Sequence, residues 1–398
     1  MLLGPRDLKL GFNEMIPLML VPELARLVVL SSEVDFKLEH ESLKSFEHIY
    51  EPRFAATVIQ LSRASYHALR IMHSKMSLIK TVLSSVPWKI DSMIETASRA
   101  VYTDEDWANI KSDLILMLNV TEADIQTVAT KANQTGELFD TVLNIADEVH
   151  EAMGYTGNRT EREIRNYQRM VRRGEKDIKD FKTAGKEAFA KHLQILLQKS
   201  KKQMNEQKIV KSAAKHLLLR IAEIQQLLHV LKKFCYRLDS FSGELRRHQQ
   251  QHSNFWNHII QYSDYVRGRR AEMRARTNNK KLKHSCKHMQ ETVTIYLNVS
   301  QNFFLPHLAN VSSWQAKTQG MWKSAVDQLN MKAQEVNKGI EDFRTKTKIK
   351  VDREMRRMWE AFAKIHLHKI QPRNKTEKQE NITYTVPHSY PSLFNIEL

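Results

Sequence analysis

The sequence predicts an all-α protein, an elongated helical bundle with a long antiparallel coiled-coil neck. Three observations predict it. No proline occurs between Pro87 and Pro306, and proline is the residue that breaks helices most strongly. Glycine accounts for 11 of the 398 residues, about 3% where roughly 7% is usual. Two segments also carry apolar residues at the heptad spacing of coiled coils.

Prolines and apolar spacing divide the chain into three predicted regions. Residues 1–101 begin with a proline-containing part that allows only short helices, followed from Arg53 by one helix. Pro87 is predicted to kink or end that helix near Val86, because a proline disfavours helix in the residue before it. Residues 102–371 form the long bundle. Residues 372–398 lose helical periodicity and are predicted to be an irregular tail.

The stretch YTDEDWANIKSDLILMLNVTEADIQTV, Tyr102 to Val128, holds two helix-start signals. Thr103 with Asp106, and then Thr121 with Asp124, each resemble a capping box with Asp in the place of Glu or Gln. They predict a short helix that turns at a tight corner into a longer one. Two glycines, at positions 154 and 157, are predicted to end the second helix.

Two heptad seams lie further along the chain, separated by charged sequence. The stretch Gln198–Lys208 has one apolar residue in eleven, and we interpret it as a solvated turn of helix or as a hairpin tip. Antiparallel packing of the seams predicts a long bundle. The first seam holds Leu217, Ile221, Ile224, Leu228, Leu231, Cys235, Leu238, Leu245, His252 and Trp256; the second holds Trp322, Val326, Leu329, Ala333, Val336, Ile340 and Phe343.

The chain carries 62 Lys and Arg against 45 Asp and Glu, a formal net charge of +17. Such an excess favours anionic partners, either acidic lipid or nucleic acid. Basic residues are densest between Arg267 and Lys287, where Glu272 is the one acid. We interpret this run either as a site that contacts phosphates, on lipid head groups or on nucleic acid, or as a solvated helix end or loop. No aromatic residue lies among the basic ones, which disfavours the stacking of nucleic-acid bases. The basic residues are Arg267, Arg269, Arg270, Arg274, Arg276, Lys280, Lys281, Lys283 and Lys287.

No motif points to an enzyme. The patterns GxxxxGKS/T, GxGxxG after a strand, HExxH and GxSxG do not occur. His284 and His288 have a spacing that suits a metal on a helix, but Cys286 between them would point away, so we predict no metal site. No catalytic residue and no cofactor is predicted. Cys235 is interpreted as a small buried hydrophobic residue.

Signals for the compartment of the protein point in different directions. The apolar segment Ile16–Leu30 is interrupted by Pro22, Glu23 and Arg26, and we interpret it as buried or amphipathic rather than as a membrane span or a signal peptide. Seven Asn-x-Ser/Thr sequons are more than chance supplies and favour a secreted protein. We therefore expect a secreted or membrane-associated protein, with a cytoplasmic location as the alternative.

The same stretch around the two predicted caps resembles the start of the helical bundle in the alpha-xenorhabdolysin A-type components. These proteins are half of a binary pore-forming toxin family related to cytolysin A. The resemblance covers roughly residues 100–370 and implies docking on membranes together with a second component. The residues that carry it are Thr103, Asp106, Trp107, Ile110, Leu118, Thr121, Asp124 and Ile125.

These patterns support two main hypotheses for function. The first is a membrane-acting helical bundle that resembles one component of a binary pore-forming toxin and works by homo- or hetero-oligomerisation on lipid membranes. The alternative is an intracellular coiled-coil scaffold that binds acidic lipid surfaces as BAR-type domains do. Nucleic-acid binding is a third interpretation and the least favoured of the three.

Overall fold

The computed structural model describes residues 16–39, 46–99, 103–261, 269–309, 324–342 and 345, and the side chains of residues 269–278 are outside the description. Residues 1–340 form one compact unit and residues 341–398 a second. The elements of the first unit are α1 (Leu20–Glu33), α2 (Phe54–Ala97), α3 (Asp104–Gly136), the 3₁₀ turn η3 (Glu137–Phe139), α4 (Asp140–Thr183), α5 (Glu187–Gln261), α6 (Arg269–Val299), the π-helical turn η5 (Ser300–Phe304) and α7 (Leu305–Leu308). Residues 324–342 are also helical.

The predicted all-α bundle with a long antiparallel helix pair is confirmed. No β-strand forms among the described residues; a single antiparallel bridge joins Lys37 and Arg53. The 75 residues of α5 correspond to about 110 Å of helix at 1.5 Å per residue. This length is possible because α5 contains no proline and a single glycine, Gly243.

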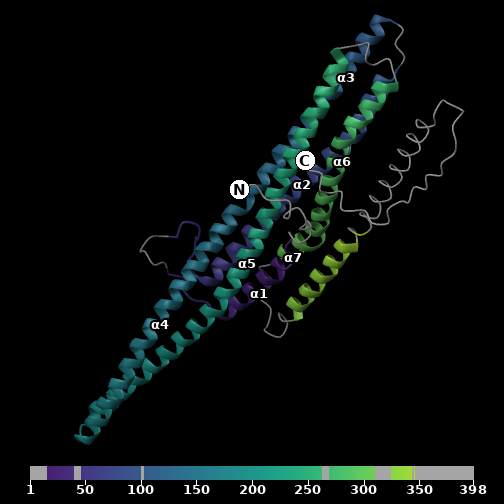
Figure 1. The fold of residues 1–398 in the computed structure, drawn as a ribbon. Coiled ribbons are helices and arrows are strands. Elements are labelled where there is room, and N and C mark those ends of the chain that lie inside the picture. Colours follow the sequence, from purple (N-terminus) through teal and green to yellow (C-terminus); the bar gives the residue numbers. More distant parts are fainter. Residues whose placement is uncertain are drawn as a thin grey trace, which may run out of the picture. The chain divides into compact units, whose positions relative to one another are not determined.

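α5 pairs with α3 and α4 in one continuous antiparallel register (Figure 1). As the chain advances along α4, its partners on α5 move steadily backwards: Asp140 pairs with Lys232, Asp147 accepts a hydrogen bond from Gln225, and Glu161 and Glu175 pair with Lys211 and Lys201. The 3₁₀ turn between α3 and α4 does not interrupt this register. α3 and α4 therefore act as one long partner of α5.

The turn between α4 and α5 is a glycine-capped helix end. Gly185 has φ of +70°, a region that residues with a Cβ rarely occupy. The amide of Lys186 donates to the carbonyl of Phe181 over 2.9 Å, and that of Gly185 to Lys182 over 3.2 Å, which is the Schellman pattern. Of the two interpretations of Gln198–Lys208, the structure selects the solvated helical turn, because α5 runs through it.

The Thr103 cap is confirmed, and the second predicted cap is wrong. Thr103 Oγ1 accepts from the amide of Asp106 over 3.1 Å, and the Asp106 carboxylate accepts from the amide of Thr103 over 2.8 Å. Thr121 is instead buried within α3, where its hydroxyl donates to the carbonyl of Met117 over 2.8 Å. A threonine can satisfy its hydroxyl in this way without ending a helix. Asp124 binds Lys89 and Ser85 of α2, so the predicted corner does not form.

The expected helix end at Gly154 and Gly157 is wrong, and so is an end of α2 at Pro87; the alternative of a kink at Pro87 stays a prediction. α2 continues through Pro87 and α4 through both glycines. A proline removes one helical hydrogen bond, but Val86 and Ile90 beside Pro87 are fully buried. Packing of the flanking side chains outweighs the local cost, since most helix stability in proteins comes from tertiary contacts.

The core brings together α1, α2, α3, α4, α5, α6 and the helix that begins at residue 324. The first predicted seam is buried at every position named for it. In the second seam, four members, Val326, Leu329, Ala333 and Ile340, are buried and Val336 is partly buried against them. Trp322 and Phe343 lie outside the described residues. α1 is almost entirely buried, so its segment is a core helix.

Candidate functional site

Two kinds of site were sought in the described part of the chain: clusters of metal ligands and helices with the character of a membrane span. No group of three His, Cys, Asp or Glu side chains comes together there as metal ligands, so His284 and His288 belong to no such group. Among the described helices, none has both the length and the apolar character to cross a bilayer. The features that remain are surfaces and helix contacts.

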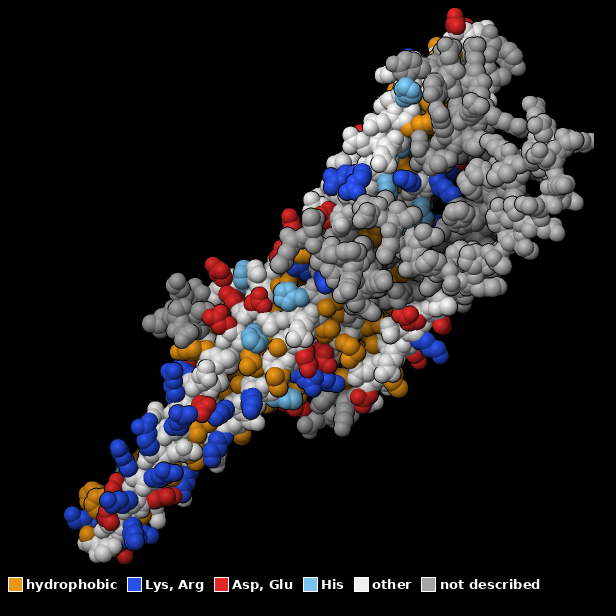
Figure 2. Space-filling model, viewed as in Figure 1, with side chains coloured by type: hydrophobic (Ala, Val, Ile, Leu, Met, Phe, Trp, Pro, Cys, Tyr) orange, Lys and Arg blue, Asp and Glu red, His pale blue; other side chains and the backbone are white. Residues whose placement is uncertain are grey.

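The distal part of the α4–α5 hairpin carries most of the excess charge. We define the hairpin tip as residues 159–215. It holds 17 Lys or Arg and 7 Asp or Glu, a formal net charge of +10 out of +17 for the chain. Figure 2 shows blue side chains crowded along this end of the molecule. Because the charge is concentrated on one pair of helices, it produces a strongly positive surface.

Large apolar side chains are exposed among these charges. Phe189 is 65% and Ile195 66% exposed, and Met170, Leu196 and Ile209 are exposed as well. Phe189 and Leu196 are seven residues apart on α5, so they share one face of the helix. Single exposed apolar residues are common on protein surfaces, but three within eight residues at the end of a hairpin form a local apolar site.

Salt bridges hold the two helices of the hairpin tip together. Glu161 accepts from Arg165 over 2.8 Å and lies 3.2 Å from Lys211, and these contacts lower its pKa. Arg159 has a raised pKa because it binds Glu163 and then Glu39. Solvent screens these surface pairs, so each contributes little to stability. Three of the seven acidic residues of the hairpin tip, Glu161, Glu163 and Glu175, are in ion pairs, and the surplus charge is basic.

The basic residues predicted as an anion site between positions 267 and 287 are only partly described. Lys280 and Lys281 of α6 are exposed. Lys283 forms an ion pair with Asp91 of α2, and Lys287 is partly buried. Arg267 and the side chains of Arg269, Arg270, Arg274 and Arg276 lie outside the described residues. The described members therefore include one lysine that links two helices.

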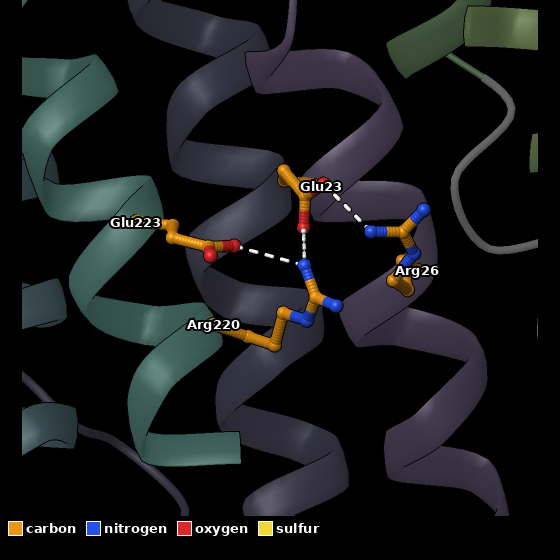
Figure 3. Close-up of polar contacts among 4 residues, drawn as sticks. All are labelled: Glu23, Arg26, Arg220 and Glu223. Carbon is orange, nitrogen blue, oxygen red and sulfur yellow. Dashed lines mark hydrogen bonds and ion pairs between the residues drawn. The ribbon is translucent and has the colours of Figure 1, made fainter. Parts of the chain in front are cut away.

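A buried ionic network fastens α1 to α5 (Figure 3). Glu23 is 6% exposed and accepts hydrogen bonds from Arg26 over 2.8 Å and from Arg220 over 3.1 Å. Arg220 also donates to Glu223 over 2.9 Å. A buried carboxylate requires such partners, because an unpaired buried charge is strongly destabilising. This network adds an ionic link between α1 and α5 to the apolar contacts that bury α1.

The segment between α1 and α2 is fastened to α4. The Glu148 carboxylate accepts from three consecutive amides, those of Glu47, His48 and Ile49, over 2.6, 2.9 and 2.9 Å. Glu39, earlier in the segment, binds Arg159. The N-terminal part of the chain therefore reaches the base of the hairpin.

Sequence reasoning identified the charge of the chain but not the hairpin tip. Its basic residues are spread evenly over two helices, whereas the sequence pattern drew attention to the densest short run. The signal that would have found the tip is the net charge over a window of about sixty residues, combined with apolar positions that do not fit the helical seam. Phe189 and Ile195 are such positions.

Comparison with known proteins gives structural matches alone. No family model matches the chain, and no curated protein sequence matches it. The crystal structure of XaxA from Xenorhabdus nematophila is similar with a TM-score of 0.46 and 12% identity, over 76% of this chain and 98% of that one. YaxA from Yersinia enterocolitica is similar with a TM-score of 0.40 and 11% identity, over 73% of this chain and 99% of that one.

Both structures are alpha-xenorhabdolysin A-type toxins, the family that the sequence around Thr103 resembles. The similarity concerns the helical fold. The residues of the hairpin tip have to be judged on their own chemistry.

Proposed function

We propose that this protein acts at membranes by docking the hairpin tip on an anionic lipid surface. The observation that carries the proposal is the coincidence of a net charge of +10 with exposed Phe189, Ile195 and Leu196 at one end of a helix pair. Each Lys or Arg near an anionic surface contributes about 1 kcal/mol. Burying a large apolar side chain in the membrane interface adds about 1.5–3 kcal/mol.

The apolar residues favour lipid over nucleic acid. A positive groove alone would serve phosphate on either partner. Nucleic-acid surfaces of low sequence preference use aromatic rings on which bases stack, whereas Ile195, Leu196 and Ile209 are aliphatic. Aliphatic side chains beside lysines match the boundary between lipid head groups and acyl chains.

The resemblance to A-type components extends the proposal to assembly. The protein then works as an oligomer on the membrane, with itself or with a second toxin-like protein component. This role requires a secreted or membrane-associated protein. The intracellular scaffold is the rival, since it uses the same surface without permeabilising the membrane.

Co-sedimentation with liposomes tests the docking step. The protein is mixed with vesicles of phosphatidylcholine alone or with 30% phosphatidylserine, a composition chosen for about −50 mV of surface potential. We expect binding to the acidic vesicles that weakens with added salt. Phe189→Ser with Ile195→Ser is expected to reduce the bound fraction, and Leu116→Ser, at a position 63% exposed on α3, is the matched control.

A second pair of variants separates the two basic regions. Lys199→Gln with Lys202→Gln removes charge from the hairpin tip, and Lys280→Gln with Lys281→Gln removes it from the exposed part of α6. The proposal predicts a loss of binding in the first pair only. Equal binding by wild type and both tip variants would show that the hairpin tip is not the docking end.

Dye release from the same vesicles distinguishes pore formation from scaffolding. Leakage, together with ring-shaped particles in negative-stain images, supports the toxin-like role. Binding without leakage, under every condition that includes candidate partner proteins, supports the scaffold.

A further inference from the structure

Three histidines bond to polar side chains along α6 and η5, and we call them the histidine seam. His252 Nδ1 lies 2.7 Å from Asn279 Oδ1, and His248 Nδ1 lies 2.8 Å from Ser285 Oγ, both between α5 and α6. His73 Nδ1 of α2 lies 3.1 Å from Ser300 Oγ of η5. Imidazole groups thus hold α6 to α5, and the π-helical turn that directly follows α6 to α2. Histidine is the side chain whose charge changes most readily near neutral pH.

His252 is placed so that only its neutral form fits. It is 0% exposed and Asn279 is 1% exposed. Asn279 Oδ1 also accepts from Trp256 Nε1 over 3.3 Å, so the amide oxygen faces both rings and Nδ1 of His252 carries the proton. Nε2 of His252 is buried without a partner among the described residues. A second proton there creates a buried charge with no acceptor, which is strongly unfavourable.

The surroundings of all three histidines oppose protonation. Burial lowers the pKa of His252 to about 4, against a smaller opposing effect of its bond to Asn279. Burial is also the leading cause of the lowered pKa of His248, and it lowers the pKa of His73 as well. The charged groups around His248 are Glu244 and Arg247 of α5 and Lys281 and His284 of α6, and only Glu244 favours the protonated ring.

Beside the histidine seam, α6 itself carries a stripe of buried, mainly apolar residues. Five residues of α6 at spacings of four and three are almost fully buried: Leu282, Cys286, Met289, Val293 and Tyr296. The Tyr296 ring stacks on Phe234 of α5 with centroids 5.7 Å apart. Separation of α6 from α2 and α5 would therefore uncover a continuous apolar face on a helix whose other faces are polar.

We propose that the histidine seam is an acid-sensitive latch, and that its protonation releases α6 from α2 and α5 and uncovers the apolar stripe. Polar links along α6 that do not involve histidine include the pair Lys283–Asp91, the bond from Gln290 to Ser84 over 2.8 Å and the bond from the Tyr296 hydroxyl to the carbonyl of Leu69 over 3.5 Å. This inference does not depend on docking by the hairpin tip.

The direction of the pH effect follows from linkage. The pKa of a histidine in the latch lies below its ordinary 6.5, so the latch has its full strength above pH 6.5 and weakens as the pH falls towards 4. For His252 alone, shifting the value from 6.5 to about 4 changes the opening equilibrium by on the order of 30-fold at pH 5. His248 and His73 add to this in the same direction.

Hydrogen–deuterium exchange of the full chain between pH 7.4 and 4.5 tests the latch, with rates normalised to the intrinsic rate at each pH. We expect the amides of residues 279–299 to lose protection by about 30-fold at pH 5, while α3 and α4 keep theirs. Return to pH 7.4 restores the protection. Unchanged protection of α6 down to pH 4.5, or equal loss in all helices, overturns the proposal.

Asparagine variants identify the groups responsible. His252→Asn and His248→Asn keep an amide nitrogen near the place of Nδ1 but cannot take up a proton, so both are expected to reduce the acid response of α6. His216→Asn, at an exposed position of α5, is the matched control and keeps the full response. If His252→Asn fails to fold, the acid response of α6 in His248→Asn, compared with that of wild type, still tests the proposal, because His248 is only partly buried. A wild-type response in His248→Asn and His252→Asn overturns the proposal.

Discussion

The ionic network between α1 and α5 offers a sharp test of how the N-terminal helix is held. Replacing Arg220 with Ala leaves Glu23, at 6% exposure, with Arg26 as its remaining partner. A hydrogen bond to a charged group contributes about 1.5–3 kcal/mol. Because the Arg220 side chain is 25% exposed, we expect a loss near the lower end, about 1.5–2 kcal/mol.

Replacing Glu23 and Arg220 together is expected to change stability much less than replacing Arg220 alone. In Glu23→Leu with Arg220→Met, no buried charge is left behind, and apolar replacements of buried ion pairs are often neutral or stabilising. We expect the double variant to lie within about 1 kcal/mol of wild type. Arg165→Ala removes a surface pair with Glu161 and is the control, with a smaller loss expected than for Arg220→Ala because solvent screens the pair.

Urea unfolding followed by helical circular dichroism measures these free energies, and trypsin cleavage after Arg26 reports whether α1 opens locally. The reasoning is refuted if Arg220→Ala costs no more than the Arg165→Ala control. It is also refuted if the double variant loses as much stability as Arg220→Ala, since the pair would then be stabilising in its own right.

The fold supports three further predictions. Thr103→Ala removes half of the capping box with Asp106 and is expected to cost about 1 kcal/mol, seen as faster amide exchange confined to the first turn of α3. Gly185→Ala places a Cβ at φ of +70° and is expected to destabilise the hairpin turn by about 1 kcal/mol, measured as a lowered melting temperature, whereas Gly157→Ala inside α4 is expected to raise it. Burial raises the pKa of the Cys235 and Cys286 thiols to about 12, so neither is expected to react with a thiol reagent at pH 8 until urea unfolds the protein; rapid reaction in the native state would contradict their burial.

Much of the helical fold was predictable because its causes are local or periodic. Missing prolines and scarce glycines permit long helices, and the heptad spacing from Leu217 onwards marks one buried face. The stripe on α6 from Leu282 to Tyr296 has the same spacing, yet it was overlooked because lysines and histidines surround it. A strongly charged segment can still contribute one narrow apolar face to a bundle.

The errors share one cause. Thr121 has local chemistry that favours the start of a helix, and Pro87 and Gly154 have chemistry that favours its end, yet each of the three lies inside a helix. Placing a glycine or a proline inside a helix lowers the stability of the helix by about 1–3 kcal/mol. Packing of buried neighbours such as Val86 and Ile90 outweighs this loss. Sequence alone does not show which signals are overruled, because the decision depends on contacts with helices far away in the chain.

By itself, the sequence determined that the chain is helical, strongly basic and built around at least one long apolar seam, since composition and periodicity are properties of the residues alone. The tertiary structure decided where the excess charge gathers, which apolar residues stay exposed beside it, and which histidines face asparagine and serine across a helix interface. Those features depend on pairs of residues such as His252 and Asn279, or Glu23 and Arg220. Only the packed helices bring such pairs within a few ångströms.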